Sequence, residues 1–416
     1  MQDNEKKPAL RFKGFTDPWE QRKLGEIAVF SKGVGYSKND LCEEGTPIIL
    51  YGRLYTKYET CVFDVDTFVK EKAGSVYSKG GEVIVPASGE TAEDISIASV
   101  VVKPGILLGG DLNIVSPTAE YDSAFLALTI SSGATHKYLS SLAQGKSVVH
   151  LHNSDIQSVS AKFPTKREQE KIHLIFGKID TLITLHQRKY EKLVNIKKSM
   201  LDKMFPKNGA SVPEIRFKGF TDPWEQRKLT NLCEKFTDGD WIEAKDQSDS
   251  GVRLVQTGNV GVTEYLDKPN NKKWISFETF EQLHCEEVYP GDILISRLPE
   301  PAGRACIMPN LGTKMITAVD CTIVRPNAVT STRFLLQYLS SQAYFDAVNT
   351  CLAGGTRQRI SRGNLAQFNV PIPSSKIEQE KIGEVLEKLD TLITLHQRKL
   401  EKLQNIKKSC LEKMFV

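Results

Sequence analysis

The chain has 416 residues, of which 40% are hydrophobic and 25% charged, a balance typical of folded proteins that excludes intrinsic disorder. One hydrophobic core seldom organises so many residues, so the length predicts at least two domains. The first residues lack a secretory signal and no segment reaches the roughly 18 apolar residues of a membrane span, which predicts a cytoplasmic protein without membrane contact; the net charge of +4 permits nucleic-acid binding but does not argue for it.

Most of the sequence is one domain-sized segment that occurs twice. The letters RFKGFTDPWEQRKL begin at Arg11 and return unchanged from Arg216, while EQEKI and DTLITLHQRK recur at a separation of 210 residues. A period of this length indicates a duplicated domain and not a stack of short repeats. We therefore expect a first domain over 1–164, a first long helix over 165–206, a second domain over 207–374 and a second long helix over 375–416.

The shared opening motif has the residues of a helix start. Asp17 suits the N-cap, Pro18 the first helical position and Glu20 the third, so a short helix is predicted there and at the second copy. The motif's tryptophans, Trp19 and Trp224, are expected to anchor each domain on the long helices.

The segments between the shared ends differ between the two copies and mix two patterns. Short β-branched and aliphatic runs bounded by glycine and proline predict strands: TPIIL (46–50), EVIVP (82–86), SIASVVV (96–102), DILIS (292–296) and CTIV (321–324). The runs AFLALTI, KYLSSLA and FLLQYLS have helical spacing. Each variable domain is therefore predicted to be α+β.

The two tails predict long helices. Thr165 with Glu168, and Ser375 with Glu378, form capping boxes, and apolar residues then recur at helical spacing for about 40 residues, or ~60 Å of helix. Two amphipathic helices of this length are expected to pack on each other as an antiparallel coiled coil with pseudo-two-fold symmetry, which brings the C-terminus beside the first domain. The residues predicted for the subunit or helix interface are Ile179, Leu182, Leu193, Ile196, Leu389, Leu392, Leu403 and Ile406.

Motifs of catalysis and metal binding do not stand out. The sequence has no triphosphate loop, no nucleophile elbow, no His-Glu-x-x-His and no Asn/Asp-Pro-Pro-aromatic tetrapeptide of amino-methyltransferases, and its eight cysteines form no Cys-x-x-Cys pair. His150 and His152 have the spacing of one strand face, for which a packing or polar-edge role is favoured over a ligand pair. His186 and His396 are expected in the helix seam. No catalysis, metal or cofactor is predicted for this chain.

Polar loops of the variable domains offer candidates for DNA contact. Arginine can bind guanine in bidentate fashion, asparagine can bind adenine, and lysine contacts phosphates. The candidates are Arg53, Lys57, Lys146, Asn153, Arg297, Arg304, Arg357, Arg359, Arg362 and Asn364.

These features together resemble the specificity subunits of type I restriction-modification systems. The resemblance rests on the duplicated opening motif, the GEVIV and GDILI elements, and GGTRQRISRGNL followed by VPIP and EQEKI, and it spans essentially the whole chain. It implies a non-catalytic subunit with two target recognition domains, each reading one half of an interrupted, asymmetric sequence in double-stranded DNA, with the coiled coil as spacer.

The resemblance also implies partners. Two modification subunits, which bind S-adenosylmethionine and methylate adenine, and restriction subunits, which use ATP and Mg, are expected to assemble on this chain. The alternatives left open are a coiled-coil protein-interaction scaffold without DNA specificity and a self-sufficient nuclease or methyltransferase.

One departure between the copies leaves a question open. The first domain has QGKSVVHLHNSD in the place of GGTRQRISRGN, so the arginines have no charged counterpart beyond Lys146. Either that loop is structural in the second domain, or the first domain reads its half of the target with other residues.

Overall fold

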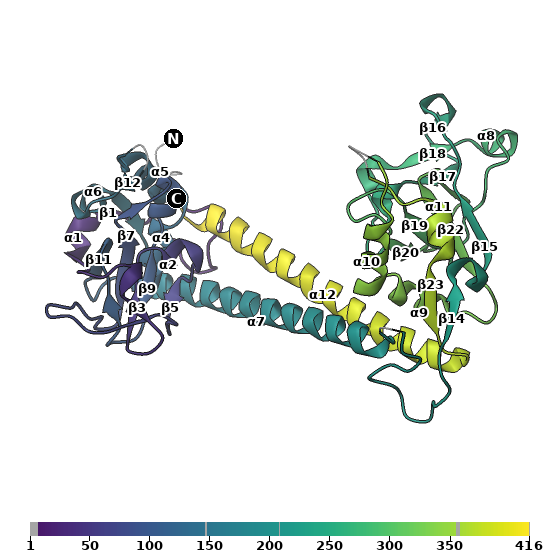
Figure 1. Cartoon of the computed structure of the whole chain (residues 1–416). Coiled ribbons are helices and arrows are strands. Elements are labelled where there is room, and N and C mark those ends of the chain that lie inside the picture. The colour runs from purple at the N-terminus through teal and green to yellow at the C-terminus, as the bar shows by residue number, and fades with distance from the viewer. Residues whose placement is uncertain (1–6, 146–147, 208, 355–357, 416) are drawn as a thin grey trace. The chain divides into compact units, whose positions relative to one another are not determined.

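The protein folds into two α+β units, each of which includes parts of two long helices (Figure 1). The computed structural model describes residues 7–145, 148–207, 209–354 and 358–415. The first unit joins residues 1–186 to 399–416, and the second spans 187–398. The long helices are α7 (Lys166–Met204) and α12 (Lys376–Met414). The predicted fold class, two tandem α+β domains each followed by a long helix, is confirmed.

The first unit is built around a five-stranded sheet in the order β2-β11-β7-β9-β5. Its central strand β7 is the predicted EVIVP run, and all five of its residues are buried. A four-stranded sheet, β10-β4-β6-β3, and the pairs β1-β13 and β12-β8 complete the strands. The strands are β1 (Glu20–Lys23), β2 (Ala28–Lys32), β3 (Leu41–Cys42), β4 (Thr46–Ile49), β5 (Cys61–Val62), β6 (Phe68–Val69), β7 (Glu82–Pro86), β8 (Ser88–Gly89), β9 (Ser99–Val101), β10 (Leu107–Leu108), β11 (Leu112–Pro117), β12 (Val149–His150) and β13 (Ser160–Phe163). The helices are α1 (Leu24–Ile27), η2 (Lys38–Asp40), α2 (Arg53–Thr56), α3 (Ala92–Ile95), α4 (Ser123–Ile130), α5 (Gly133–Leu142) and α6 (Asn153–Ser158).

The second unit repeats this plan with two four-stranded sheets, β15-β22-β19-β20 and β16-β18-β17-β21, and the pair β14-β23. Its strands are β14 (Glu225–Lys228), β15 (Cys233–Asp238), β16 (Gln247–Ser248), β17 (Val252–Val255), β18 (Lys273–Ile275), β19 (Ile293–Ser296), β20 (Ala305–Ile307), β21 (Met315–Thr317), β22 (Cys321–Pro326) and β23 (Asn369–Ile372). Its helices are η3 (Leu229–Leu232), η4 (Ala244–Asp246), η5 (Thr257–Asn259), η6 (Pro269–Asn271), α8 (Phe277–Gln282), α9 (Thr332–Tyr338), α10 (Gln342–Thr350) and α11 (Arg362–Gln367). The predicted strands and the helical runs AFLALTI, KYLSSLA and FLLQYLS are confirmed in both units.

A glycine marks the same crowded turn in each domain. A Cβ added to Gly33, after β2, would lie 1.9 Å from the carbonyl oxygen of Gly109, and one added to Gly239, after β15, would lie 2.2 Å from that of Thr317. Any larger residue would push the strands apart, so both copies keep glycine.

The opening motif forms a strand and not the predicted helix. Glu20–Lys23 pairs antiparallel with β13, and Glu225–Lys228 pairs likewise with β23. Strand pairing across the domain satisfies the backbone that the Asp-Pro-x-Glu signal would have placed in a helix, so tertiary structure overrides the local preference.

Arginine and glutamate from the two shared motifs bind each other within each unit. Arg11 donates from Nε and Nη2 to the two carboxylate oxygens of Glu168 at 2.7 and 2.8 Å, and Arg216 does the same to Glu378 at 2.7 and 2.9 Å. The glutamates, which the sequence assigned to capping boxes, are 0% and 1% exposed. A buried bidentate pair of this kind fixes the opening motif to the start of the long helix.

The ends of the long helices belong to the cores. Phe415, after α12, stacks on Phe125 of α4 at 5.4 Å in the first unit, and the amide of Leu10 donates to Lys413 at 2.9 Å. Phe205, after α7, lies 5.3 Å from Phe334 of α9 in the second unit. The predicted return of the C-terminus to the first domain is confirmed by these contacts.

The predicted tryptophan anchors lie in the same aromatic clusters. Trp19 and Trp224 are 3% and 4% exposed, and each meets a phenylalanine edge-on at 5.7 Å, Phe125 in the first unit and Phe334 in the second. Trp224 also lies 6.0 Å from Phe205 at the end of α7.

Within each unit, α7 and α12 are joined by an ion pair. Lys407 binds Asp180 at 2.6 Å in the first unit, and Lys197 binds Asp390 in the second. Within the first unit, Phe176 of α7 lies 6.0 Å from Phe415, whereas Asp180, further along α7, pairs with Lys407, earlier in α12, so the two helices run antiparallel there.

Buried and half-buried positions of the long helices recur at alternating steps of four and three residues, the heptad spacing of a coiled-coil seam. The predicted interface residues Ile179, Leu193, Leu389 and Leu403 occupy this seam and are half-buried. The other four lie outside it and are 37–43% exposed: Leu182, Ile196, Leu392 and Ile406.

The joint between α4 and α7 in the first unit contains a histidine that its counterpart lacks. His173 Nδ1 lies 2.9 Å from Oδ1 of Asp122, and this contact raises the pKa of His173 against the opposing effect of partial burial. The equivalent position in α12 is Gly383, where a Cβ would lie 2.8 Å from Arg333.

We expect the His173–Asp122 pair to make the first joint sensitive to pH. Because the folded pKa of His173 is raised, its stabilisation is fully present below pH ~6.5 and is lost as the pH rises through the folded value. Hydrogen exchange of the α4 amides, corrected for intrinsic rate, should show less protection in His173→Gln than in the wild type at pH 6, and a smaller difference at pH 8.5. Helix α9, without such a pair, is the internal control, and a difference that grows with pH would contradict the assignment.

Candidate nucleic-acid interface

The second domain gathers three candidate arginines around two carboxylates. Arg297 Nε lies 3.5 Å from Asp238, and Arg362 Nε lies 3.7 Å from the same carboxylate. Arg359 Nη1 lies 3.6 Å from Asp320, which Arg297 also approaches at 3.9 Å. Three positive and two negative charges leave one positive charge in excess. We call these five residues the arginine cluster.

The members of the arginine cluster differ in exposure. Arg297 is 10% exposed at its side chain and donates to the carbonyl oxygen of Val319, so its guanidinium holds the loops together. Arg359 and Arg362 are 61% and 45% exposed. These two present guanidinium groups to solvent while the carboxylates restrict their positions.

Arg304 is occupied by the fold of its own domain. Its guanidinium donates to the carbonyl oxygens of Val260, Leu298, Pro301 and Thr257 at 2.7 to 3.0 Å. All of these acceptors are backbone atoms, so the side chain ties together the loops beside β17 and β19.

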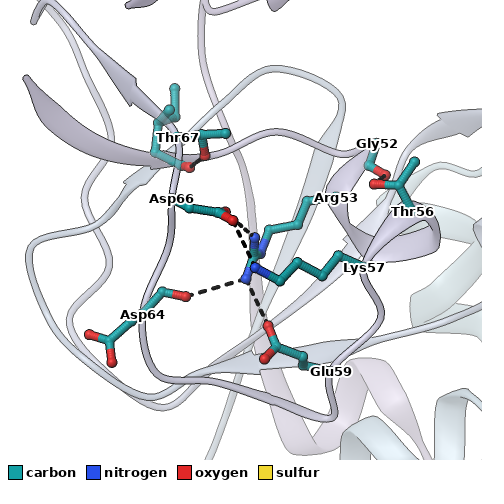
Figure 2. A network of polar contacts seen from close by, with 9 residues as sticks. Gly52, Arg53, Thr56, Lys57, Glu59, Asp64, Asp66 and Thr67 are labelled. Carbon is teal, nitrogen blue, oxygen red and sulfur yellow. Dashed lines mark hydrogen bonds and ion pairs between the residues drawn. The ribbon is translucent and has the colours of Figure 1, made fainter. Parts of the chain in front are cut away.

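Arg53 and Lys57 of the first domain lie in a network of acidic partners, as Figure 2 shows. Arg53 donates to Asp66 at 2.8 Å and to Glu59 at 2.7 Å, and its side chain is 9% exposed. Lys57 donates to the other oxygen of Asp66 at 2.8 Å, remains 54% exposed, and through this bond lowers the pKa of Asp66. Arg53 therefore braces the loop after α2, and Lys57 is the more accessible cation.

The two candidate asparagines lie at corresponding short helices. Asn153, the first residue of α6, donates from Nδ2 to the carbonyl oxygen of Ser31 at 2.9 Å. Asn364 of α11 is exposed, with its backbone amide capped by Ser361 at 3.0 Å. Lys146 and Arg357 lie outside the described residues.

Sequence reasoning missed one exposed aromatic side chain. Trp241, three residues after Asp238, is 72% exposed, which is unusual for so large an apolar side chain. The signal that could have identified Trp241 was its run of polar neighbours. His150 and His152, for which a packing or polar-edge role was expected, are both exposed, with their rings 6.5 Å apart and nearly parallel.

Among the described residues, no group of three or more His, Cys, Asp or Glu side chains is placed to hold a metal ion. The helices within the same ranges include none with the length and apolar content needed to cross a bilayer.

The chain contains two copies of one domain, which share a backbone arrangement and differ in their polar side chains. This is the arrangement of a protein with two recognition domains. A family model described as the type I restriction modification DNA specificity domain matches residues 16–195 and again residues 221–405. The chain belongs to this family of DNA specificity domains. It is a specificity subunit for DNA target recognition, and such subunits are non-catalytic. The scaffold alternative has no support in these findings.

Known proteins agree with this assignment. The chain is 21% identical over 407 residues to the type I restriction enzyme MjaVIII specificity subunit of Methanocaldococcus jannaschii, which covers 94% of this chain and 91% of that protein. It shares its fold with the S subunit of a type I restriction-modification system from M. genitalium, with a TM-score of 0.62, 14% identity and 99% coverage of both chains. A structure described as showing complex assembly and conformational transition of the type I R-M system matches with a TM-score of 0.50, 16% identity and coverage of 96% and 98%.

Proposed function

We propose that each domain reads one half of an interrupted, asymmetric sequence in double-stranded DNA, and that this chain thereby directs a complex for adenine methylation or cleavage in the cytoplasm. The observation that carries the proposal is the duplication: the two domains share one backbone plan but present different side chains. Different side chains select different bases, so the halves of the target are not expected to be related by symmetry.

The exposed polar candidates carry the proposed contacts with DNA. Arg359, Arg362 and Asn364 in the second domain and Lys57 in the first are exposed. Asn153 is half-buried, and its Nδ2 already donates to Ser31. Arg297, which is buried, and Arg53 and Arg304, which are half-buried, hold the loops in place. Lys146 and Arg357 stay proposals from the sequence.

The exposed apolar side chains of α7 and α12 support the proposed partners. In the first unit these are Leu182, Leu185 and Ile406, and in the second Leu392, Leu395 and Ile196, all between 37% and 45% exposed. Two equivalent apolar patches suit two copies of one partner, the modification subunits. S-adenosylmethionine, ATP and Mg are assigned to the modification and restriction subunits, since no triphosphate loop or methyltransferase tetrapeptide occurs in this sequence.

Replacing one domain should change half of the target. We expect the full chain, expressed with its modification subunit in a host without adenine methylation, to produce N6-methyladenine at one interrupted motif. Exchange of residues 31–164 for the corresponding segment of a different specificity subunit should alter one half of that motif and leave the other half and the gap unchanged. Methylation mapped across the host genome measures this. A continuous motif, or a target that the exchange leaves intact, would reject the proposal.

A further inference from the structure

The two domains hold five backbone positions in equivalent places. Gly33 N donates to Leu112 O at 2.9 Å as Gly239 N donates to Cys321 O at 3.0 Å. The residue before each of these glycines, and the residue before each acceptor, therefore occupies an equivalent position in the two domains. Lys32 in the first domain matches Asp238 in the second, and Asp111 matches Asp320.

Further hydrogen bonds extend this match. The amide of Ala87 donates to the backbone carbonyl oxygen of Asp111 at 2.8 Å, and the amide of Arg297 donates to that of Asp320 at 2.9 Å. The carbonyl oxygens of the same two residues accept from backbone amides later in the chain, that of Ala87 from Leu151 at 3.0 Å and that of Arg297 from Ile360 at 3.2 Å. Ala87 is therefore the counterpart of Arg297.

The loop that follows supplies the last two positions. His150 forms an antiparallel bridge with Gln144, and Arg359 forms the same bridge with Ala353, each through two backbone hydrogen bonds. Three residues later, α6 begins at Asn153 and α11 at Arg362. His150 thus stands where the second domain has Arg359, and Asn153 stands where it has Arg362.

Four of the five pairs differ in their side chains, and the aspartate is shared by the two copies. The arginine cluster is Asp238, Arg297, Asp320, Arg359 and Arg362, whereas the equivalent set is Lys32, Ala87, Asp111, His150 and Asn153. A backbone held constant while the side chains on it change is the arrangement expected of a surface that selects between ligands of one class, and His150 and Arg359 are both exposed on it.

We propose that His150 and Arg359 are the corresponding specificity-determining residues of the two domains, each reading a base edge of its own half-site. The inference rests on the proposed function, in which each domain reads one half of the target. It also resolves the choice that the sequence left open: the first domain uses the same loop as the second, with a histidine in the place of the arginine.

The chemistry of the two side chains gives them different preferences. Arg359 offers a bidentate donor pair that suits the two acceptors of guanine in the major groove. His150 offers an imidazole, with His152 stacked beside it as a second ring, and the amide of His152 donates to Asp155 at 2.7 Å, which fixes the start of α6. An imidazole makes one directed hydrogen bond to a base and so selects differently from a guanidinium.

Two reciprocal substitutions test the proposal in the complex of the full chain with its modification subunit. His150→Arg should introduce a preference for guanine at one position of the first half-site, by roughly tenfold or more, with the second half unchanged. Arg359→His should relax or change one position of the second half by a similar factor, with the first half unchanged. Selection from duplexes randomised in one half at a time, together with mapped N6-methyladenine, measures both.

Matched controls add or remove a guanidinium outside the five positions. Gln21→Arg adds a guanidinium to exposed β1, and Arg227→His removes one from exposed β14. Both controls should leave the two half-sites as in the wild type. Because the substituted residues are exposed, thermal unfolding should be unchanged in all four variants; if His150→Arg or Arg359→His unfolds early, His150→Gln and Arg359→Lys decide the result by the same selection.

The outcomes separate the inference from the proposed function. An interrupted wild-type motif with both half-sites unaltered by the substitutions overturns the inference and leaves the proposed function in place. If the substitutions weaken the affinity for DNA equally on all sequences and reduce its salt dependence, the residues contact phosphates, and this result also overturns the inference. A wild-type chain that yields no interrupted motif rejects the proposed function itself.

Discussion

Replacement of Arg216 by methionine is expected to lower the free energy of unfolding of the second unit by about 3 kcal/mol. The change removes a guanidinium that donates to both oxygens of Glu378 at 2.7 and 2.9 Å, and leaves a carboxylate that is 1% exposed without its charged partner. A buried charge without a partner costs far more than the net stabilisation of the intact pair, because its loss of hydration is no longer offset. Chemical denaturation followed by hydrogen exchange of α9 and α12 measures the loss.

The chain supplies a matched control for this prediction. Arg227 pairs with Glu225 at 2.7 Å in the same opening motif, but both side chains are more than 40% exposed. Arg227→Met should leave stability unchanged within error, since an exposed pair contributes little. The double variant Arg216→Met with Glu378→Met should recover most of the loss, because an apolar pair can replace a buried ion pair. Equal effects of Arg216→Met and Arg227→Met would show that burial of Glu378 is not the cause.

The equivalent ion pair of the first unit, Arg11–Glu168, shows what a repeated sequence can and cannot predict. The identity of the two copies identified the opening motif and the EQEKI segment as parts of one frame, but 157 residues separate Arg11 from Glu168. A capping box explained the glutamate from local spacing alone. The distant arginine could be found only from the fold, and the strand Glu20–Lys23 was mistaken for a helix for the same reason: its partner β13 is far away in sequence.

The long helices were the most predictable elements, yet their contacts were less so. The α-helical period of 3.6 residues places all apolar residues of a long helix on one broad face, and so it groups Leu182 with Ile179. The seam follows 3.5 residues, so Ile179 is half-buried while Leu182 stays 43% exposed. The sequence pattern thus merged two surfaces with different partners.

The candidate site was predicted by residue type and not by position. The sequence indicated arginines on loops, and Arg304 and Arg359 looked alike in it. In the structure, backbone carbonyl oxygens bind the guanidinium of Arg304, whereas the side chain of Arg359 is exposed. The match of His150 to Arg359 depends on backbone bridges that no local pattern encodes.

A glutamate at Leu182 is expected to displace one modification subunit, and glutamates at both Leu182 and Leu392 to displace two. These side chains are 43% and 42% exposed at equivalent positions of α7 and α12, one in each unit. A charge placed in an apolar interface must lose its hydration without a partner, so the affinity at that patch should fall roughly a hundredfold. Native mass measurement of the reconstituted complex should give two modification subunits per wild-type chain, one for Leu182→Glu and none for the double variant.

Leu174 distinguishes this effect from the mere introduction of charge on α7. Leu174 is 54% exposed, more than Leu182. Its counterpart in α12 is Glu384, so the second unit already has a glutamate at this position. Leu174→Glu should therefore keep both modification subunits. If Leu182→Glu also retained two subunits at concentrations near the wild-type Kd, the patches would not be the docking surface; if Leu174→Glu lost one, the first unit would use a wider surface than the second.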